Sequence, residues 1–508
     1  MVRHIQSSKP NLKSMRHTMM YMAFMGLSAC NAIPSYSIHS SVVLPTSFDT
    51  QTHSATDNQI DNQWWLSFHD SQLEQLINRA AAANFDVRTA VERVNEARAG
   101  AASINAALLP TLNLTGSLAQ SRTGLPDYVK NSGNPDTESR QIALGSDWNL
   151  DLFGGTRAAK NAALRDQEAA VWGVAGARLN AISETARQYF IYQSLLERKR
   201  LNQELLATEQ QSLLLAQHLS REGMYSDIDL NRIQADLLNI QSSLPSLNAA
   251  LVFTQNQIAL LTATPSQQMQ LIPNAAVLTS KPLNDPIPTG MPADLLTRRP
   301  DIQAAEKQVA AENARLGQAK ANRFPQLFLS TVFGDQGLTL NHLALAPSFY
   351  TNTALAFSAP LFDGGRIKAG IDNQQAKRSE ATINYDKTVL TALNQVENAL
   401  AARHGELDQL TMLKGIQQQR LQSEQHAQAL IGEGQISRLQ LLDTRRARLS
   451  ADMAVIDGQQ QNALYTIDVY SALGGGWQSF QAPASTNQTA STNPTASAST
   501  LSSPSTSR

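Results

Sequence analysis

Cysteine is almost absent from this chain: its 508 residues include one, Cys30. A single thiol excludes an intrachain disulfide framework and a multi-cysteine metal site. The nine histidines are scattered, and no two lie four positions apart, as paired metal ligands on a helix often do. We therefore expect no resident metal and no cofactor.

The chain also lacks a strong net charge and long hydrophobic runs. Its formal net charge is −1 and no cluster of lysine and arginine follows the first sixteen residues, so we expect no nucleic-acid partner. A membrane-spanning helix needs about 20 consecutive apolar residues, and no such run follows residue 30. Because neither a Ser/His/Asp constellation nor a phosphate-binding motif is recognisable, we expect a protein that is not an enzyme.

A short export signal stands at the N-terminus. Basic residues precede the apolar segment 19–27, which is too short to span a membrane. The following sequence, Leu27-Ser28-Ala29-Cys30, resembles a bacterial lipobox, which implies cleavage before Cys30 and lipidation of its thiol. An ordinary cleaved signal with an incidental cysteine is the alternative. We therefore interpret 1–29 as a lipoprotein signal peptide and 30–62 as an N-terminal anchor and linker.

The C-terminal segment 481–508 has a different character. It consists almost entirely of Ser, Thr, Ala, Pro, Asn and Gln. Such a composition cannot bury enough apolar surface to offset the entropy lost on ordering, so we expect a disordered tail.

One pattern occurs twice in the same order. Each copy has a Pro after Leu or Phe, then a glycine-rich turn after Leu-Phe, and later a Glu-Gly pair. The matching segments are Leu109-Pro110 and Phe324-Pro325, Leu152–Gly155 and Leu361–Gly365, and Glu222-Gly223 and Glu433-Gly434. This order indicates a tandem duplication, with a first repeat at 63–263, a proline-rich linker at 264–290 and a second repeat at 291–477.

Each repeat is predicted to contain two strands. Apolar and polar residues alternate near 111–121, 140–152, 326–335 and 350–361. Their length matches a tilted membrane-spanning strand of about 9–11 residues. A soluble sandwich, the alternative, is not expected from four strands separated by so much helix. Because membrane barrels begin at about 8 strands and an open sheet in lipid leaves its edges unpaired, several chains would have to share one barrel.

Long helices are predicted after each strand pair, and a shorter helix before it. Their predicted ranges are 157–219 and 227–261 in the first repeat, and 366–431 and 437–473 in the second. Apolar residues recur every seven positions, for example at Tyr385, Ala392 and Ala399, which favours packing against a partner helix.

Glycines mark two kinds of chain reversal. The strand-to-helix turns hold Gly154, Gly155, Gly364 and Gly365, where a β-carbon would oppose the reversal. The tips of the helix hairpins hold Gly223 and Gly434, each followed by a serine that suits a helix N-cap.

Together these features resemble the TolC-like outer membrane efflux factor family, and within it the lipoprotein subunits of resistance-nodulation-division (RND) tripartite efflux systems. The resemblance covers about residues 60–480. It rests on the duplicated strand pairs, the two Leu-Phe-(Asp/Gly)-Gly turns, the lipobox and the segments Pro292–Ile302 and Leu473–Trp477. It implies a mixed α and β fold: a homotrimer with a twelve-stranded membrane β-barrel, four strands from each chain, continued by a long α-helical periplasmic barrel. The linker 264–290 would join a mixed equatorial domain.

The resemblance also implies passage rather than catalysis. The chain would be the outer membrane channel subunit of a tripartite efflux pump, lipid-anchored in the cell outer membrane, with a tunnel in the periplasm. It would passively conduct small molecules to the exterior from a periplasmic membrane-fusion adaptor and an inner-membrane RND-type pump. The exit duct of a type I protein secretion system is the alternative, although those relatives usually lack the lipid anchor.

In this family the closed end of the tunnel is narrowed by a Leu-x-Leu-Leu-Asp-x-x-Arg pattern on the return helix of the second repeat. Here the pattern implies that Leu439 forms an apolar constriction and that Asp443 and Arg446 make polar contacts between subunits. An ordinary solvated Asp/Arg pair is the alternative. The aligned positions of the first repeat are Ile228, Arg232 and Ala235, so this periplasmic gate is expected in the second repeat alone.

Overall fold

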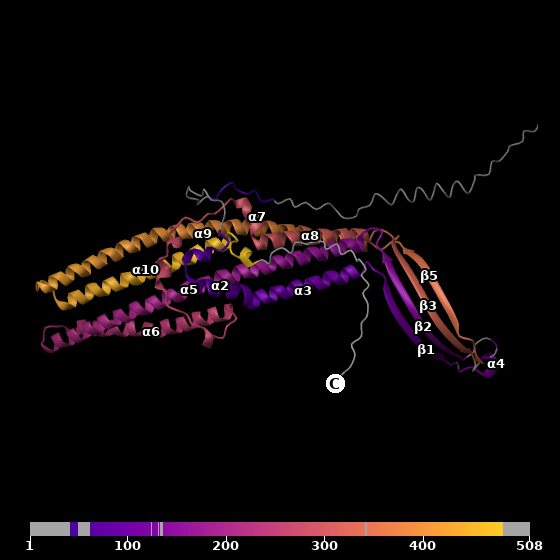
Figure 1. Ribbon diagram of the computed structural model, residues 1–508, viewed down its shortest axis with the longest axis horizontal. Coiled ribbons are helices and arrows are strands. Elements are labelled where there is room, and N and C mark those ends of the chain that lie inside the picture. Colours follow the sequence, from indigo (N-terminus) through magenta and orange to yellow (C-terminus); the bar gives the residue numbers. More distant parts are fainter. Residues whose placement is uncertain are drawn as a thin grey trace, which may run out of the picture.

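The computed structural model describes residues 41–48, 61–122, 124–130, 132, 136–340 and 343–480. The expected signal peptide at 1–29, the expected lipidation residue Cys30 and the expected tail at 481–508 lie outside the described residues. The described molecule is elongated, with a sheet at one end, two helix hairpins at the other and a belt of packed helices between them (Figure 1). The fold is mixed α and β, as expected.

The first repeat contains a strand hairpin followed by a helix hairpin. Its elements are η2 (Trp64–Phe68), α2 (Ser71–Ala83), α3 (Phe85–Ala106), β1 (Thr111–Ser121), α4 (Asp127–Lys130), β2 (Thr137–Leu150), α5 (Gly155–Arg221) and α6 (Asp227–Leu261). Two helices precede the strands instead of the single one expected. Asn84 separates them because its side chain accepts hydrogen bonds from the backbone N–H groups of Asp86 and Val87 and so caps α3.

The second repeat has the same order of strands and long helices. Three short helices lie in the linker: η3 (Ser266–Gln268), η4 (Ala275–Thr279) and η5 (Lys281–Leu283). The elements that follow are η6 (Pro292–Asp294), α7 (Leu295–Arg298), α8 (Pro300–Ala321), β3 (Gln326–Leu340), β4 (Leu343–Ala344), β5 (Ser348–Ser358), α9 (Arg366–Gly432), α10 (Arg438–Ala472) and η7 (Trp477–Phe480).

The duplication extends to the lengths of the helices. Helices α5 and α9 both contain 67 residues, and α6 and α10 both contain 35. Each second-repeat helix begins 211 positions after its counterpart, at 366 against 155 and at 438 against 227. Positions 211 apart in these helices are therefore equivalent, which allows the two repeats to be compared residue by residue. Within the described part of the chain, no helix combines the length and the apolar character needed to cross a membrane.

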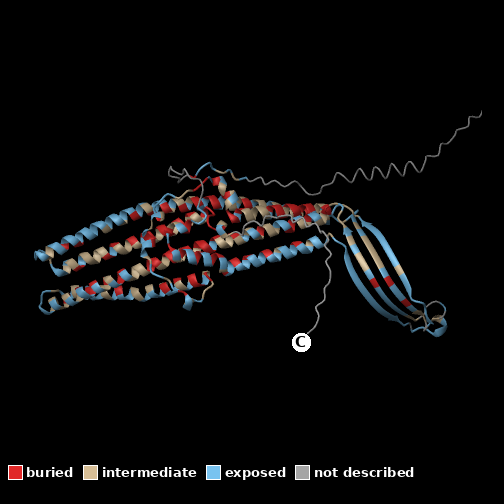
Figure 2. Ribbon diagram, viewed as in Figure 1, coloured by how far each residue is buried: buried red, intermediate tan, exposed pale blue. Residues whose placement is uncertain are grey.

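The sheet is antiparallel and open. Its long strands lie in the order β1-β2-β3-β5, so β1 and β5 form its two edges. One face carries apolar side chains, including exposed Leu114, Leu118, Leu355 and Phe357. Figure 2 shows β1 and β5 exposed along nearly their whole length. In a single chain the apolar face and both edges are therefore uncovered by the described residues.

Two strands have bounds that differ from the expected ranges. Strand β3 continues to Leu340, beyond the expected end near 335, and the short strand β4 pairs back onto it. Strand β2 begins at Thr137 rather than near 140, since its pairing with β3 runs without a break from Thr137, opposite Leu340, to Leu150, opposite Leu327. Backbone pairing thus extends beyond the segment in which apolar residues alternate.

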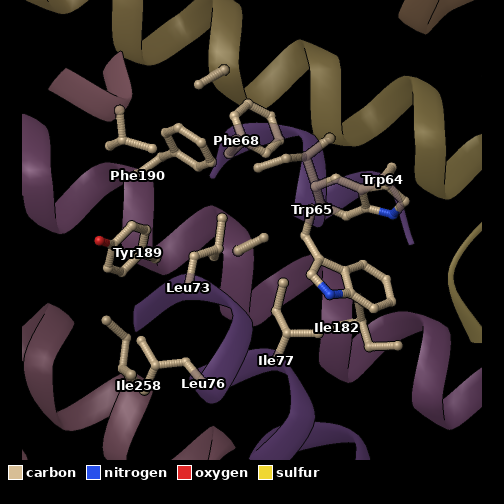
Figure 3. Close-up of a cluster of buried hydrophobic side chains, with 14 of the residues drawn as sticks. Trp64, Trp65, Phe68, Leu73, Leu76, Ile77, Ile182, Tyr189, Phe190 and Ile258 are labelled. Atoms are coloured by element: carbon tan, nitrogen blue, oxygen red, sulfur yellow. The ribbon is translucent and has the colours of Figure 1, made fainter. Parts of the chain in front are cut away.

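The main core lies in the belt between sheet and hairpins. Aromatic and aliphatic side chains from η2, α2, α5 and α6 pack together there (Figure 3). Tyr189 on α5 donates a hydrogen bond of 2.6 Å to Asp70, whose carboxylate also caps α2 and accepts from Asn274 of the linker. Burial, followed by the bond to Asp70, raises the pKa of Tyr189. The linker is thereby attached to the first repeat.

Candidate functional site

The hairpin tips lie at the end of the molecule opposite to the sheet (Figure 1). Gly223 and Gly434, predicted at these tips, have φ angles of 72° and 71°, in the left-handed region that glycine adopts without strain. The return helices are capped by serine: the Ser226 hydroxyl accepts from the N–H of Ile228, and Ser437 forms a reciprocal pair with Gln440. Glycine at the tip and serine at the start of the return helix therefore explain both chain reversals.

The candidate gate residues lie on α10 just beyond the second tip. Leu439 is half-buried, and Asp443 and Arg446 follow on the same face of the helix at spacings of four and three. A guanidinium N–H of Arg446 donates to the Asp443 carboxylate at 2.5 Å. The α10 pattern thus forms an ion pair within one chain.

Arg446 also reaches the first repeat. Its Nη1 atom lies 3.1 Å from a carboxylate oxygen of Asp236 on α6 and 3.9 Å from one of Glu209 on α5. Burial alone would lower the pKa of Arg446, but Glu209, Asp443 and Asp236 outweigh it, so the pKa is raised. Arg446 is therefore held as a cation that connects α10 with both helices of the other hairpin.

Glu209 and Asp236 were not predicted from the sequence. The family pattern concerns the second repeat alone, and both carboxylates come from the first. The only signal in the sequence was the absence of matching charges in the second repeat, where the equivalent positions hold Arg420 and Ala447. Only the packing of the two hairpins shows which charges meet.

The predicted strand-to-helix turns combine glycine with an acidic cap. Gly154, Gly364 and Gly365 have positive φ angles of 80°, 63° and 88°. Gly155 is instead the first residue of α5, and a β-carbon there would lie 3.2 Å from the β-carbon of Ala321. The Asp363 carboxylate accepts from backbone N–H groups of the following turn, and these bonds lower its pKa. Glycine conformation and the Asp363 cap therefore account for the reversal from strand to helix in the second repeat.

The segments that carried the family resemblance are also structural. In Pro292–Ile302, the buried side chain of Arg299 donates to the carbonyl oxygen of Ala472 at 2.7 Å and pairs with Asp301. In Leu473–Trp477, the Trp477 indole N–H donates to the Arg298 carbonyl oxygen at 3.3 Å. The two segments therefore bind each other and fasten the end of α10 to the start of α8.

In the described part of the chain, no group of three or more His, Cys, Asp or Glu side chains could hold a metal ion. The charged side chains at the hairpins pair with one another. Such an arrangement can hold two helices together or release them.

The family described as outer membrane efflux protein matches residues 76–264 and 291–475, one segment in each repeat. The solvent efflux pump outer membrane protein SrpC of Pseudomonas putida is 29% identical over 482 residues, covering 90% of this chain and 98% of SrpC. The cation efflux system protein CusC of Escherichia coli O157:H7 is 27% identical, covering 89% and 97%. Among solved structures, the open state of the Neisseria gonorrhoeae MtrE outer membrane channel superposes with a TM-score of 0.76 at 26% identity, covering 88% of this chain and 99% of MtrE.

Proposed function

Because this chain belongs to the outer membrane efflux protein family, we propose that it is the outer membrane channel subunit of a tripartite efflux pump. It passively conducts small molecules through a periplasmic tunnel to the exterior. The observation that carries this proposal is the open sheet with a bare apolar face, continued by hairpins whose 67-residue helices are about 100 Å long at 1.5 Å per residue. A periplasmic membrane-fusion adaptor and an inner-membrane RND-type pump would supply the cargo at the hairpin tips.

The sheet supports a trimer. Its edge strands, β1 and β5, leave backbone groups unpaired, which is costly in lipid. Three copies joined edge to edge give twelve long strands, within the range of membrane barrels. Pairing of β5 with β1 of the next copy repeats the contact that β2 makes with β3 inside one chain.

The helices support the same assembly. Within one chain, Leu201 and Leu205 of α5 are buried against Leu449 of α10. The equivalent positions are Met412 and Ile416 on α9, which are 70% and 51% exposed, and Leu238 on α6, which is 65% exposed. The apolar residues of the contact between α5 and α10 thus have apolar equivalents on α9 and α6, where they are exposed in a single chain. Contact between α9 and α6 of the next copy would bury them.

The periplasmic gate is proposed at Leu439, Asp443 and Arg446. Three copies around one axis would bring three Leu439 side chains into an apolar constriction, with the ion pairs of Arg446 holding each α10 inward. We expect that Asp443→Ala combined with Arg446→Ala raises the open probability in planar bilayers by about tenfold, because partly exposed pairs contribute about 0.2–1 kcal/mol each and three copies act together. An unchanged open probability would contradict the gate assignment.

Cys30 is proposed as the lipid anchor, supported by the Leu27-Ser28-Ala29 sequence before it. Cys30→Ala should abolish labelling by radioactive palmitate in cells, because the chain has no other thiol to accept the lipid. Ser28→Ala keeps a small residue before the thiol and should remain labelled. Labelling that persists in the Cys30→Ala protein would refute the anchor.

The comparisons favour efflux over the secretion duct. The relatives reported above are named for efflux pumps. Members of this family are channel proteins rather than enzymes. Because one relative is named for solvents and the other for cations, we propose a channel for small molecules without assigning its cargo.

A further inference from the structure

Arg140 on β2 is the only lysine or arginine in the strands that the structure describes. We propose that its guanidinium binds a phosphate group of the phosphorylated glycolipid in the outer leaflet of the outer membrane. This inference rests on the membrane barrel proposed above. It goes beyond conduction through the channel, because it assigns a lipid partner to the outside of the barrel.

The strand register places Arg140 on the apolar face of the sheet. Arg140 lies opposite Leu118 of β1 and opposite Gly337 of β3. Side chains two positions apart on a strand point to the same face, so Arg140 follows Ile142 in the row that is proposed to contact lipid. Leu118 and Ile142 are 87% and 65% exposed in the single chain. The arginine therefore faces the membrane rather than the tunnel.

The position of Arg140 along β2 matches the outer edge of the membrane. Strand β2 runs from α4, at the far end of the sheet, towards the helices and ends at Leu150 (Figure 1). Ten positions at about 3.3 Å each, tilted by about 40°, give a height of about 25 Å, which is the height of the apolar band of membrane barrels. An arginine is tolerated at this boundary, whereas at the midplane it would be strongly unfavourable. Lipid phosphates lie at the same boundary.

Gly337 leaves the space in which the Arg140 side chain lies. A β-carbon at Gly337 would be 2.5 Å from Nε and 3.0 Å from Cγ of Arg140. Gly337 is not among the glycines with a positive φ angle, so the backbone itself does not require glycine there. The arginine therefore lies over β3, at a groove of about 480 Å³ whose lining includes Leu118 and Thr339.

The Arg140 guanidinium is available to an external anion. Among the described residues it has no hydrogen-bond or ion-pair partner. Glu138, two positions away on the same face, accepts instead from Nε2 of Gln120 at 2.6 Å. A planar guanidinium binds phosphate through two parallel N–H groups, and the exposed leucine and isoleucine beside it suit acyl chains. A phosphorylated lipid matches both kinds of group.

Two carboxylates share this end of the apolar face. They belong to Glu138 and to Asp335, which lies opposite Ile142. Mg²⁺ binds carboxylate and phosphate oxygens together, so both acids are compatible with the same lipid. The contact made by Arg140 is therefore measured with divalent cations removed.

The test is native mass spectrometry of the full-length trimer in detergent, titrated with phosphorylated lipid A in the presence of EDTA. We expect one lipid per chain. Arg140→Leu should lower the affinity at least about tenfold, because charge-assisted hydrogen bonds are lost. Arg140→Lys keeps the charge without the planar fork and should lose less. Arg323→Leu removes the same charge from an exposed position at the helix end of β3 and should bind as the wild type does.

A second variant tests the geometry. Gly337→Val keeps the arginine but fills the space of its side chain, so it should weaken binding as Arg140→Leu does. Heat-modifiable migration on gels checks that each variant is trimeric. Should Arg140→Leu not assemble, Arg140→Gln keeps a polar side chain and replaces it.

Three results would overturn the inference. They are unchanged affinity of the trimeric Arg140→Leu protein, equal binding of lipid A whose phosphates have been removed, and displacement of lipid A by an equal concentration of inorganic phosphate. The last result would assign the arginine to a free anion. A wild type that forms no trimer would instead contradict the barrel, whereas trimers that bind lipid A independently of Arg140 would leave the barrel intact and reject the lipid site alone.

Discussion

Replacing Met412 and Ile416 by aspartate is expected to abolish the trimer and with it the channel. Both side chains are exposed in the single chain, and their equivalents Leu201 and Leu205 are buried. Burial of one large apolar side chain contributes about 1.5–3 kcal/mol, and the substitution also places two carboxylates in an apolar contact at each of three interfaces. Size-exclusion chromatography in detergent and heat-modifiable migration on gels would detect monomers.

The matched control is Leu214→Asp on α5. Leu214 is about as exposed as Met412. Its equivalent in the second repeat, Gln425, is also exposed, so we expect no contact between helices at position 214. This variant should remain trimeric. Trimers of normal stability from the Met412→Asp, Ile416→Asp protein would contradict the proposed contact between α9 and α6. Leu238→Asp, on the opposite side of that contact, should reproduce the loss of assembly.

Arg403→Met is expected to destabilise the fold strongly, because its buried guanidinium holds the linker. Arg403 lies buried on α9 and donates to the carbonyl oxygens of Leu283 and Asp285 in the linker, at 3.1 and 2.7 Å, and to the Thr466 hydroxyl. Burial lowers its pKa. Because each hydrogen bond to a charged group contributes about 1.5–3 kcal/mol, we expect the free energy of unfolding to fall by about 3 kcal/mol or more. Thermal unfolding followed by intrinsic fluorescence would measure the loss as a lower Tm.

Lys414→Met is the control for Arg403. It removes a positive charge from an exposed position of the same helix, and the equivalent residue, Gln203, is exposed as well. Its Tm should be unchanged. If the Arg403→Met protein had the same Tm as the wild type, the linker would be held by its apolar contacts alone.

Much of the architecture could be predicted from local signals. Period-two alternation located the four long strands, and glycine followed three residues later by serine located both hairpin tips, because each signal acts over a few residues. The ends of the strands were less predictable: Thr137 and Leu340 extend the sheet through pairing with each other, although they are about two hundred positions apart. Arg403 occupies a seven-residue seam position, where periodicity favours an apolar residue, and its contact with the linker was not predicted.

The amino-acid order was enough to predict the duplicated unit, its turns and its long helices, and it led to the proposal that several chains share one barrel. These properties follow from periodicity, from the backbone freedom of glycine and from the hydrogen-bonding demands of strand edges in lipid. The folded arrangement alone showed that Arg446 meets Glu209 and Asp236, that Arg403 holds the linker, and that Arg299 joins the two family segments. Contacts between residues so far apart depend on how the hairpins pack, and local sequence contains no signal for the partner that a charged side chain will reach.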